Sequence, residues 1–193
     1  MSGSLIEVVL DRRCILQPKP AFHVSGDSGA CVLASILGSD PQDIYDQFIG
    51  SVRPLSRDDV IYVLQKADTD NLIDRLVTAT PHWALPEFRL SYGYTSWQLS
   101  DEWFDYVRMA LDAGYYGLAE LNDRHRGPRN GGSSWAMFVG IRETRKPPSR
   151  RGARFEQVKR EVLVSTPKFD KWIDVSPLLK YQGGYNVILV RPS

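Results

Sequence analysis

The sequence predicts an α+β domain in which helices come first and an antiparallel sheet follows. Up to Gly114, apolar residues recur at helical spacing between residues that typically begin or end helices. After Gly114 the chain changes to short apolar or alternating runs, separated by glycine, proline and charged residues, which is typical of strands. Helices that precede the strands, instead of alternating with them, favour helices packed on an antiparallel sheet.

Five helices are expected before Gly114, and each has its own start or stop signal. Asp40-Pro41 offers an N-cap followed by proline at the first helical position. Ser56 and Asp59 have the spacing of a capping box ahead of an apolar face. The five expected helices run from Cys31 to Gly38, onward from Asp40-Pro41, onward from Ser56, around Leu72 to Val77, and from Ser100 to Gly114.

Five strands are expected after Gly114, joined by two loops that are rich in basic residues. The loops cover residues 122–132 and 142–154, and both are interpreted as solvated hairpin tips. The second strand is largely apolar, which places it near the centre of a sheet. The expected strands are Tyr115–Leu121, Ser134–Arg142, Glu161–Thr166, Trp172–Val175 and Tyr185–Arg191.

Length and composition indicate a single globular domain. The chain has 193 residues, of which 42% are hydrophobic and 24% charged, and its net charge is +1. We find no internal repeat and no linker. A single domain is therefore expected over residues 1–193, with a helical half over about 14–114 and a sheet half over about 115–191.

The same composition argues against several classes of protein. The balanced charge disfavours a nucleic-acid partner, and no run approaches the roughly 18 apolar residues of a membrane helix. The chain start lacks the basic-then-apolar plan of a secretory signal, and two cysteines do not make a disulfide framework, so a cytoplasmic location is expected. Cys14, Cys31, His23, His82 and His125 are too scattered for metal-ligand spacing, so no metal or cofactor is expected.

Cys31 is the most informative single residue. It lies in the first turn of the first expected helix, behind the glycine-rich segment Ser25–Gly29. A helix N-terminus presents unpaired N–H groups and a partial positive charge, which favour the thiolate form of a nucleophilic cysteine. The alternative is a cysteine that only packs in the core, because free cysteine is among the most buried residue types.

The order of elements resembles that of papain-like cysteine peptidases. Gly29, Ala30 and Cys31 match the C-G-[SA]-C-[WY] signature of that group, while Ser28 and Val32 depart from it. The C-terminal half is similar to the bacteriocin-processing, C39-like branch, and the resemblance spans about residues 14–191. The segments that carry it are Gly117–Leu121, Gly131–Gly140, Val162–Pro167 and the ending from Trp172 to Val187.

The departures from the family pattern fall where its chemistry takes place. Counted back from Gly140, the family's general-base histidine aligns with Ser134, and its orienting aspartate aligns with Thr166. A Cys–His pair works because imidazole takes the thiol proton, while a third residue fixes the tautomer. The resemblance implies Gln17 as oxyanion donor beside the Cys31 amide, and His125 is the candidate replacement base.

Two functions from different classes follow. The favoured one is a catalytically impaired pseudo-peptidase that binds a peptide or an anionic partner in the former active-site cleft. The alternative is an active peptidase, amidase or acyltransferase in which Cys31 attacks the carbonyl of a small acyl or peptide substrate. The residues expected to line the cleft and contact the partner are Ser134, Trp135, Arg124, Arg126 and Arg129.

A third hypothesis concerns the basic loop over residues 142–154. It would contact nucleic acid or another acidic surface through its arginine and lysine side chains. The loop has no aromatic residues between its cations, which argues against a base-stacking platform.

Overall fold

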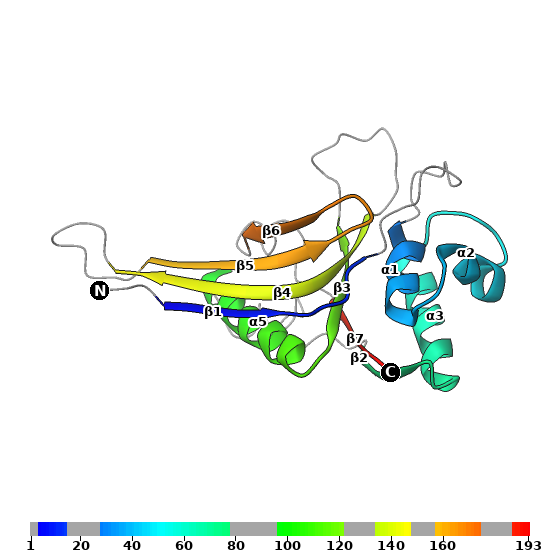
Figure 1. The fold of residues 1–193 in the computed structure, drawn as a ribbon, viewed down its shortest axis with the longest axis horizontal. Coiled ribbons are helices and arrows are strands. Elements are labelled where there is room, and N and C mark those ends of the chain that lie inside the picture. Colours follow the sequence, from blue (N-terminus) through cyan, green and yellow to red (C-terminus); the bar gives the residue numbers. More distant parts are fainter. Residues whose placement is uncertain (1–3, 15–27, 78–95, 122–133, 148–156, 175–186) are drawn as a thin grey trace.

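The computed structural model describes residues 4–14, 28–77, 96–121, 134–147, 157–174 and 187–193 (Figure 1). These residues form an α+β fold with one seven-stranded sheet, and every strand pair in it is antiparallel. The predicted fold class, helices packed on an antiparallel sheet, is confirmed at this level. No helix in the described ranges is long and apolar enough to span a membrane.

The sheet has the strand order β2-β7-β3-β4-β5-β6, and β1 pairs with β4 outside this path. The short strand β7 lies between β2 and β3, so the end of the chain is held inside the sheet. The strands are β1 (Ser4–Val9), β2 (Ile73–Val77), β3 (Tyr116–Leu121), β4 (Ser134–Lys146), β5 (Gln157–Ser165), β6 (Asp170–Asp174) and β7 (Ile188–Pro192).

Two helices begin at the predicted capping residues, Asp40 and Ser56, whereas the helix expected from Ser100 begins at Ser96. The Asp40 side chain accepts a hydrogen bond from the Gln42 N–H, with Pro41 at the start of the helix. Ser56 and Asp59 form the predicted capping box. The described helices are α1 (Ser28–Leu37), α2 (Pro41–Ile44), the π-helical segment η1 (Tyr45–Ile49), α3 (Arg57–Thr69) and α5 (Ser96–Asp112).

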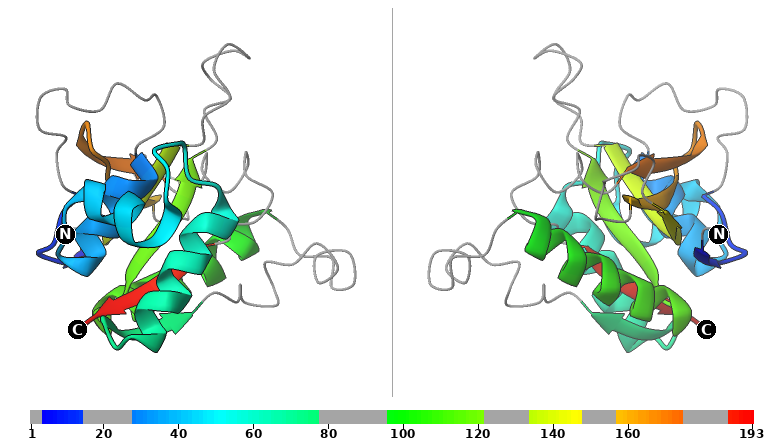
Figure 2. Two further views of the ribbon diagram at one scale, coloured as in Figure 1. Left: turned by 90° about the vertical axis from the view of Figure 1, so that its right-hand side faces the viewer. Right: turned by 90° about the vertical axis from the view of Figure 1, so that its left-hand side faces the viewer.

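Helices cover both faces of the central part of the sheet. One buried cluster joins α1 and α3 to the sheet and contains Leu33, Leu64 and Trp135. The second cluster joins α5 to the opposite face through Phe104 and Phe138. Figure 2 shows α3 and α5 on either side of β7. The central strands are therefore buried on both faces, as their largely apolar sequence indicates.

Strand β4 is long enough to pair with two strands along one edge. Residues 134–138 pair with β3, and residues 140–145 pair with β1. A register irregularity against β5 lies between Phe138 and Gly140, where the Leu10 N–H donates to the Val139 carbonyl at 2.8 Å. Beyond this point β1, β4 and β5 extend together away from helices α1 to α3 (Figure 1).

The expected short helix around Leu72 to Val77 is wrong. Residues Ile73–Val77 form β2, which pairs with β7. Asn71 has φ of 57°, in the left-handed region, so helix α3 cannot continue through it. The apolar spacing of this segment fits either structure, and pairing with a strand more than 100 positions away decides between them.

Two further differences concern the strands. Strand β1 was not predicted, although Leu5-Ile6-Glu7-Val8-Val9 has strand composition. Residues 142–146 were assigned to a loop and instead continue β4, paired with β5. The hairpin loop that remains, residues 148–156, and the basic loop at 122–132 lie outside the described residues.

Candidate functional site

Helix α1 begins directly beside the start of β4. Ser28, the first residue of α1, accepts a hydrogen bond through its Oγ from the Trp135 backbone N–H at 2.8 Å. Ser134 is the preceding residue and the first of β4. The structure therefore brings Ser134 to the first turn of the helix that carries Cys31.

Trp135 fixes this junction from within the core. Its side chain is fully buried, and its indole N–H donates to the Leu55 carbonyl at 3.0 Å. A Cβ on Gly29 would lie 3.0 Å from Leu55 Cβ and 3.1 Å from Trp135 Cδ1, closer than most side chains pack. Glycine at this position thus lets the helix start approach the strand. The Trp135 side chain, expected to line the cleft, is a core residue in this structure.

The Cys31 side chain is enclosed. Only 1% of the residue is exposed, and it belongs to the buried cluster that includes Leu33 and Trp135. One turn further along α1, the Ser35 hydroxyl donates to the Cys31 carbonyl at 2.6 Å. A thiol this deeply buried packs in the core like an apolar side chain, and a substrate carbonyl cannot reach it unless the structure opens locally.

Cys14 belongs to the same buried cluster as Cys31, which was not predicted from its position in the sequence. The Cys14 N–H donates to Ser165 Oγ at 2.9 Å, which holds the segment after β1 against the end of β5. Burial raises the pKa of the Cys14 thiol to about 12, against a smaller lowering by a hydrogen bond with Ser35. Both cysteines are free of disulfides. Cys14 approaches α1 only because β1 joins the sheet.

Thr166, which aligns with the family's aspartate, follows the last residue of β5. Because β4 and β5 are antiparallel, the end of β5 lies beside the start of β4. The Thr166 hydroxyl donates to the Phe169 carbonyl at 3.1 Å and accepts from the Phe169 and Lys168 N–H groups at 3.1 and 3.2 Å. It is committed to the turn between β5 and β6.

The remaining predicted site residues lie outside the described ranges. These are Gln17, His125, Arg124, Arg126 and Arg129. All three histidines of the chain fall in such segments. Within the described ranges no three His, Cys, Asp or Glu side chains gather as a metal site would require. The described part of the site offers a buried thiol and hydroxyl residues at the two partner positions, and neither hydroxyl can act as a base at neutral pH.

Comparisons with protein-family models, with curated proteins and with solved structures found no match to this chain.

Proposed function

We propose that this chain is a papain-like, C39-like domain that binds a peptide or an anionic partner beside α1 and does not hydrolyse it. The observation that carries the proposal is the enclosed Cys31 side chain, 1% exposed, together with serine and threonine at positions 134 and 166. A cysteine hydrolase needs an accessible thiolate and a base, and removal of triad partners costs orders of magnitude in turnover.

The contact between α1 and β4 supports a binding surface at this place. The Ser28–Trp135 hydrogen bond and the fully buried Trp135 ring fix the helix start against the strand. Arg124, Arg126 and Arg129 precede β4 in sequence and would supply the positive charge that selects an anionic ligand. The partner contact of Ser134 remains part of the proposal, and the buried Trp135 ring supports this surface from within the core.

Thiol labelling distinguishes this proposal from an active enzyme. Iodoacetamide is added to the native protein at pH 7, and peptide mapping by mass spectrometry follows Cys14 and Cys31 separately. We expect both native thiols to react at least a hundredfold more slowly than in urea, because alkylation requires an exposed thiolate. Rapid labelling of Cys31 alone, with a dependence on a pKa below about 7.5, would establish an activated nucleophile and overturn the non-hydrolytic proposal.

A binding assay tests the second half of the proposal. The probe is a random heptapeptide library displayed on phage, panned on the wild-type chain and on the double variant Arg124→Ala/Arg126→Ala. We expect the double variant to weaken binding of selected anionic peptides at least fivefold, and Cys31→Ala to leave it unchanged. Lys66→Ala, on the exposed side of α3, is the matched control. Equal binding by wild type and double variant would contradict the proposed site.

A further inference from the structure

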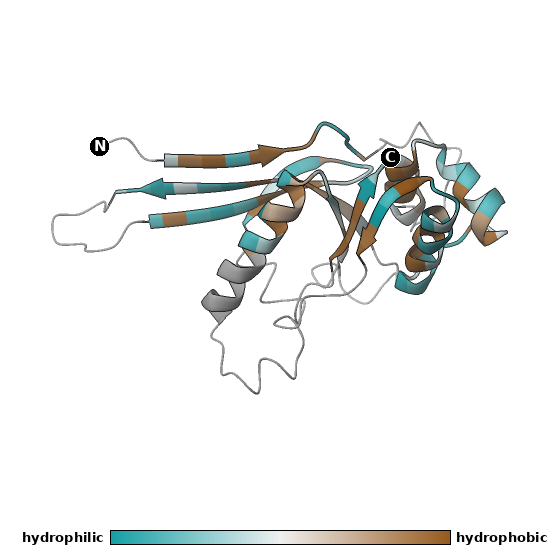
Figure 3. Ribbon diagram, turned by 90° about the horizontal axis from the view of Figure 1, so that it is seen from below, coloured by the Kyte–Doolittle hydropathy of each residue, from teal (hydrophilic) through white to brown (hydrophobic). Residues whose placement is uncertain are grey.

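The hairpin of β4 and β5 concentrates positive charge. Residues 142–160 hold eight Lys and Arg side chains against two Glu, whereas the whole chain has a net charge of only +1. Figure 3 shows hydrophilic residues predominating where β4 and β5 extend beyond the helices. Because side chains alternate between faces along a strand, the charged side chains of β4 and β5 divide between the two faces of this pair of strands. The two faces differ in how far these charges are neutralised by ion pairs.

On the face toward α5, the positive charges are paired with a carboxylate of the fold itself. The Glu143 carboxylate, only 6% exposed, accepts from Arg145 Nε at 2.6 Å and from Arg160 Nε at 2.7 Å. The Arg160 guanidinium also lies over the Phe104 ring of α5, 5.2 Å from its centroid. These contacts are internal to the fold, so this face offers little unsatisfied charge to a ligand.

The opposite face holds its cations around one carboxylate. Glu161 accepts from Arg142 Nε at 2.8 Å and from Lys159 Nζ at 2.8 Å. The Arg142 guanidinium stacks 4.3 Å from the centroid of the Trp172 ring, which fixes its direction. Its two terminal nitrogens have no hydrogen-bond partner within the described residues. On the β1 side, Glu7 is paired in register with Arg142.

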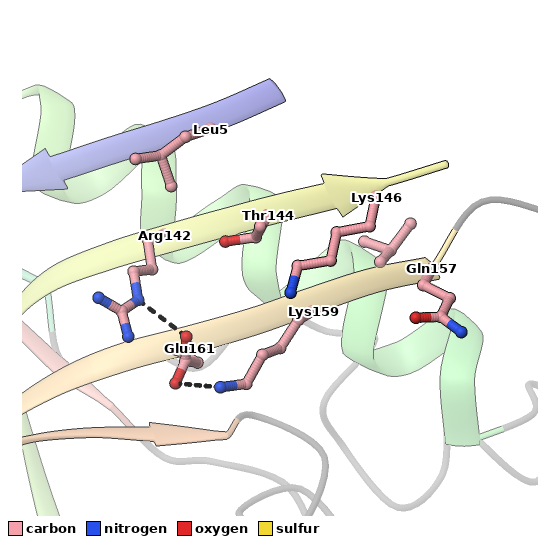
Figure 4. A pocket seen from close by; sticks show the side chains of 8 residues that line it. Leu5, Arg142, Thr144, Lys146, Gln157, Lys159 and Glu161 are labelled. Atoms are coloured by element: carbon pink, nitrogen blue, oxygen red, sulfur yellow. Dashed lines mark hydrogen bonds and ion pairs between the residues drawn. The ribbon is translucent and has the colours of Figure 1, made fainter. Parts of the chain in front are cut away.

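A groove of about 560 Å³ lies on this face, with Thr144 between the charged groups (Figure 4). Lys146 lines it and has no hydrogen-bond or ion-pair partner among the described residues. Leu5, which is paired in register with Thr144, also lines the groove and is 61% exposed. The groove therefore combines an uncompensated ammonium group, a fixed guanidinium and an exposed aliphatic side chain.

We propose that this groove binds an acidic segment of a partner protein, with its carboxylates at Lys146 and Arg142 and an aliphatic side chain on Leu5. Arg142 is suited to the role because its guanidinium is already held by Glu161 and Trp172. Preorganised cations lose less conformational freedom on binding a carboxylate than free ones do.

The composition of the groove favours a peptide over a nucleic acid. Glu161 lies within the cluster of cations and would repel the dense charge of a phosphate backbone. Among the described residues that line the groove, none is an aromatic side chain that could stack a base. Carboxylates next to aliphatic residues match both the positive charge and the exposed Leu5.

The test uses a random heptapeptide library displayed on phage, panned on the wild-type chain and on Lys146→Glu. The matched control is Lys66→Glu, an equal charge reversal on α3. We expect the wild type to enrich peptides rich in Asp or Glu and in Leu, Ile or Val. Resynthesised peptides should bind Lys146→Glu at least tenfold more weakly, and Lys66→Glu within twofold of wild type. Lys146 makes no contact that the fold needs, so the thermal unfolding midpoint of Lys146→Glu should equal that of wild type.

Three results would overturn the inference. One is a selection without acidic enrichment, and another is equal peptide affinity in wild type and Lys146→Glu. The third is tighter, Lys146-dependent binding of a single-stranded DNA 12-mer, which would assign the groove to nucleic acid. The variant Arg124→Ala/Arg126→Ala distinguishes this site from the one proposed beside α1. It should bind the peptides selected for the groove with an affinity within twofold of wild type.

Discussion

The two ends of β4 are stabilised in different ways. From Trp135 to Ile141 every residue is buried, because helices cover both faces of the sheet. From Arg142 to Lys146 charged residues replace the apolar run, and the strand is held by paired strands and ion pairs. The pairing partner switches from β3 to β1 at the irregularity beside Val139, shortly before the charged run begins at Arg142. A single strand thus passes from a core element to a surface ribbon.

This difference gives the two ends of β4 different roles, one in packing and one in binding. The buried end fixes the junction of α1 with β4 and leaves Cys31 enclosed. The exposed end presents charge that the fold does not fully use. Stability should therefore depend on apolar packing at one end and on electrostatics at the other.

The largest effect is expected at the buried end, from Trp135→Ala. The substitution leaves a cavity at the α1–β4 junction and removes the hydrogen bond to the Leu55 carbonyl, so it should lower the free energy of unfolding by about 3–5 kcal/mol. Urea unfolding at pH 7 measures this. Leu5→Ala, at a side chain 61% exposed on the ribbon, is the control and should change stability by less than about 0.5 kcal/mol. A loss below about 1 kcal/mol for Trp135→Ala would contradict the contrast.

The same contrast explains what the sequence could predict. The helix starts at Asp40 and Ser56 were predictable because a cap is a contact between residues two or three positions apart. The strand nature of Ile73–Val77 depends on pairing with β7, and that of residues 142–146 on pairing with β1 and β5. Such pairings are not local, so charge and spacing alone misassigned both segments.

The candidate site divides in the same way. The position of Cys31 early in a helix followed from the local glycine and apolar pattern, and the structure confirms it. The packing of Cys14 in the same cluster depends on the pairing of β1 with β4, and the burial of Trp135 depends on Leu55, and both are contacts between segments far apart in sequence. The apolar run of β4 indicated burial, but it could not show which side chain the indole would meet.

A second, smaller effect compares the two faces of the ribbon through Glu143→Gln and Glu161→Gln. Glu143 joins Arg145 and Arg160 on the face toward α5, and removal of its charge should cost about 2–3 kcal/mol. Loss of the Glu161 charge should cost a similar amount, because its side chain is 8% exposed against 6% for Glu143 and it also binds two cations. Urea unfolding in 0.05 and 1 M NaCl checks both. Salt should reduce the two effects equally, and a salt effect confined to one carboxylate would mean that the faces differ in this respect.

Gly140→Ala probes the point where the two ends of β4 meet. A Cβ there would lie 3.1 Å from the Val8 carbonyl oxygen and 3.2 Å from both Leu163 Cβ and Val9 Cγ2. Backbone and Cβ atoms cannot move aside without shifting β1 or β5, so a loss of about 1–2 kcal/mol is expected. Hydrogen exchange should show faster exchange in β1 than in β3, since only β1 depends on this approach. Unchanged β1 protection would show that the strand tolerates the methyl group.

The smallest effect tests whether electrostatics also matter in the helical layer. Asp59 accepts from both terminal nitrogens of Arg53 at 2.6 Å and from Ser56, and these bonds hold its pKa well below the usual range. A carboxyl whose pKa is lowered by folding adds stability above its unfolded pKa of about 3.9. That contribution is lost as the pH falls toward the folded value. Asp59→Asn should therefore cost about 1 kcal/mol at pH 7, and the difference from wild type should shrink between pH 4 and pH 2. Glu161, whose pKa is lowered chiefly by Arg142, remains in both proteins, so its own titration cancels in the comparison. A difference that stays constant down to pH 2 would mean that the cap acts through shape and not through charge.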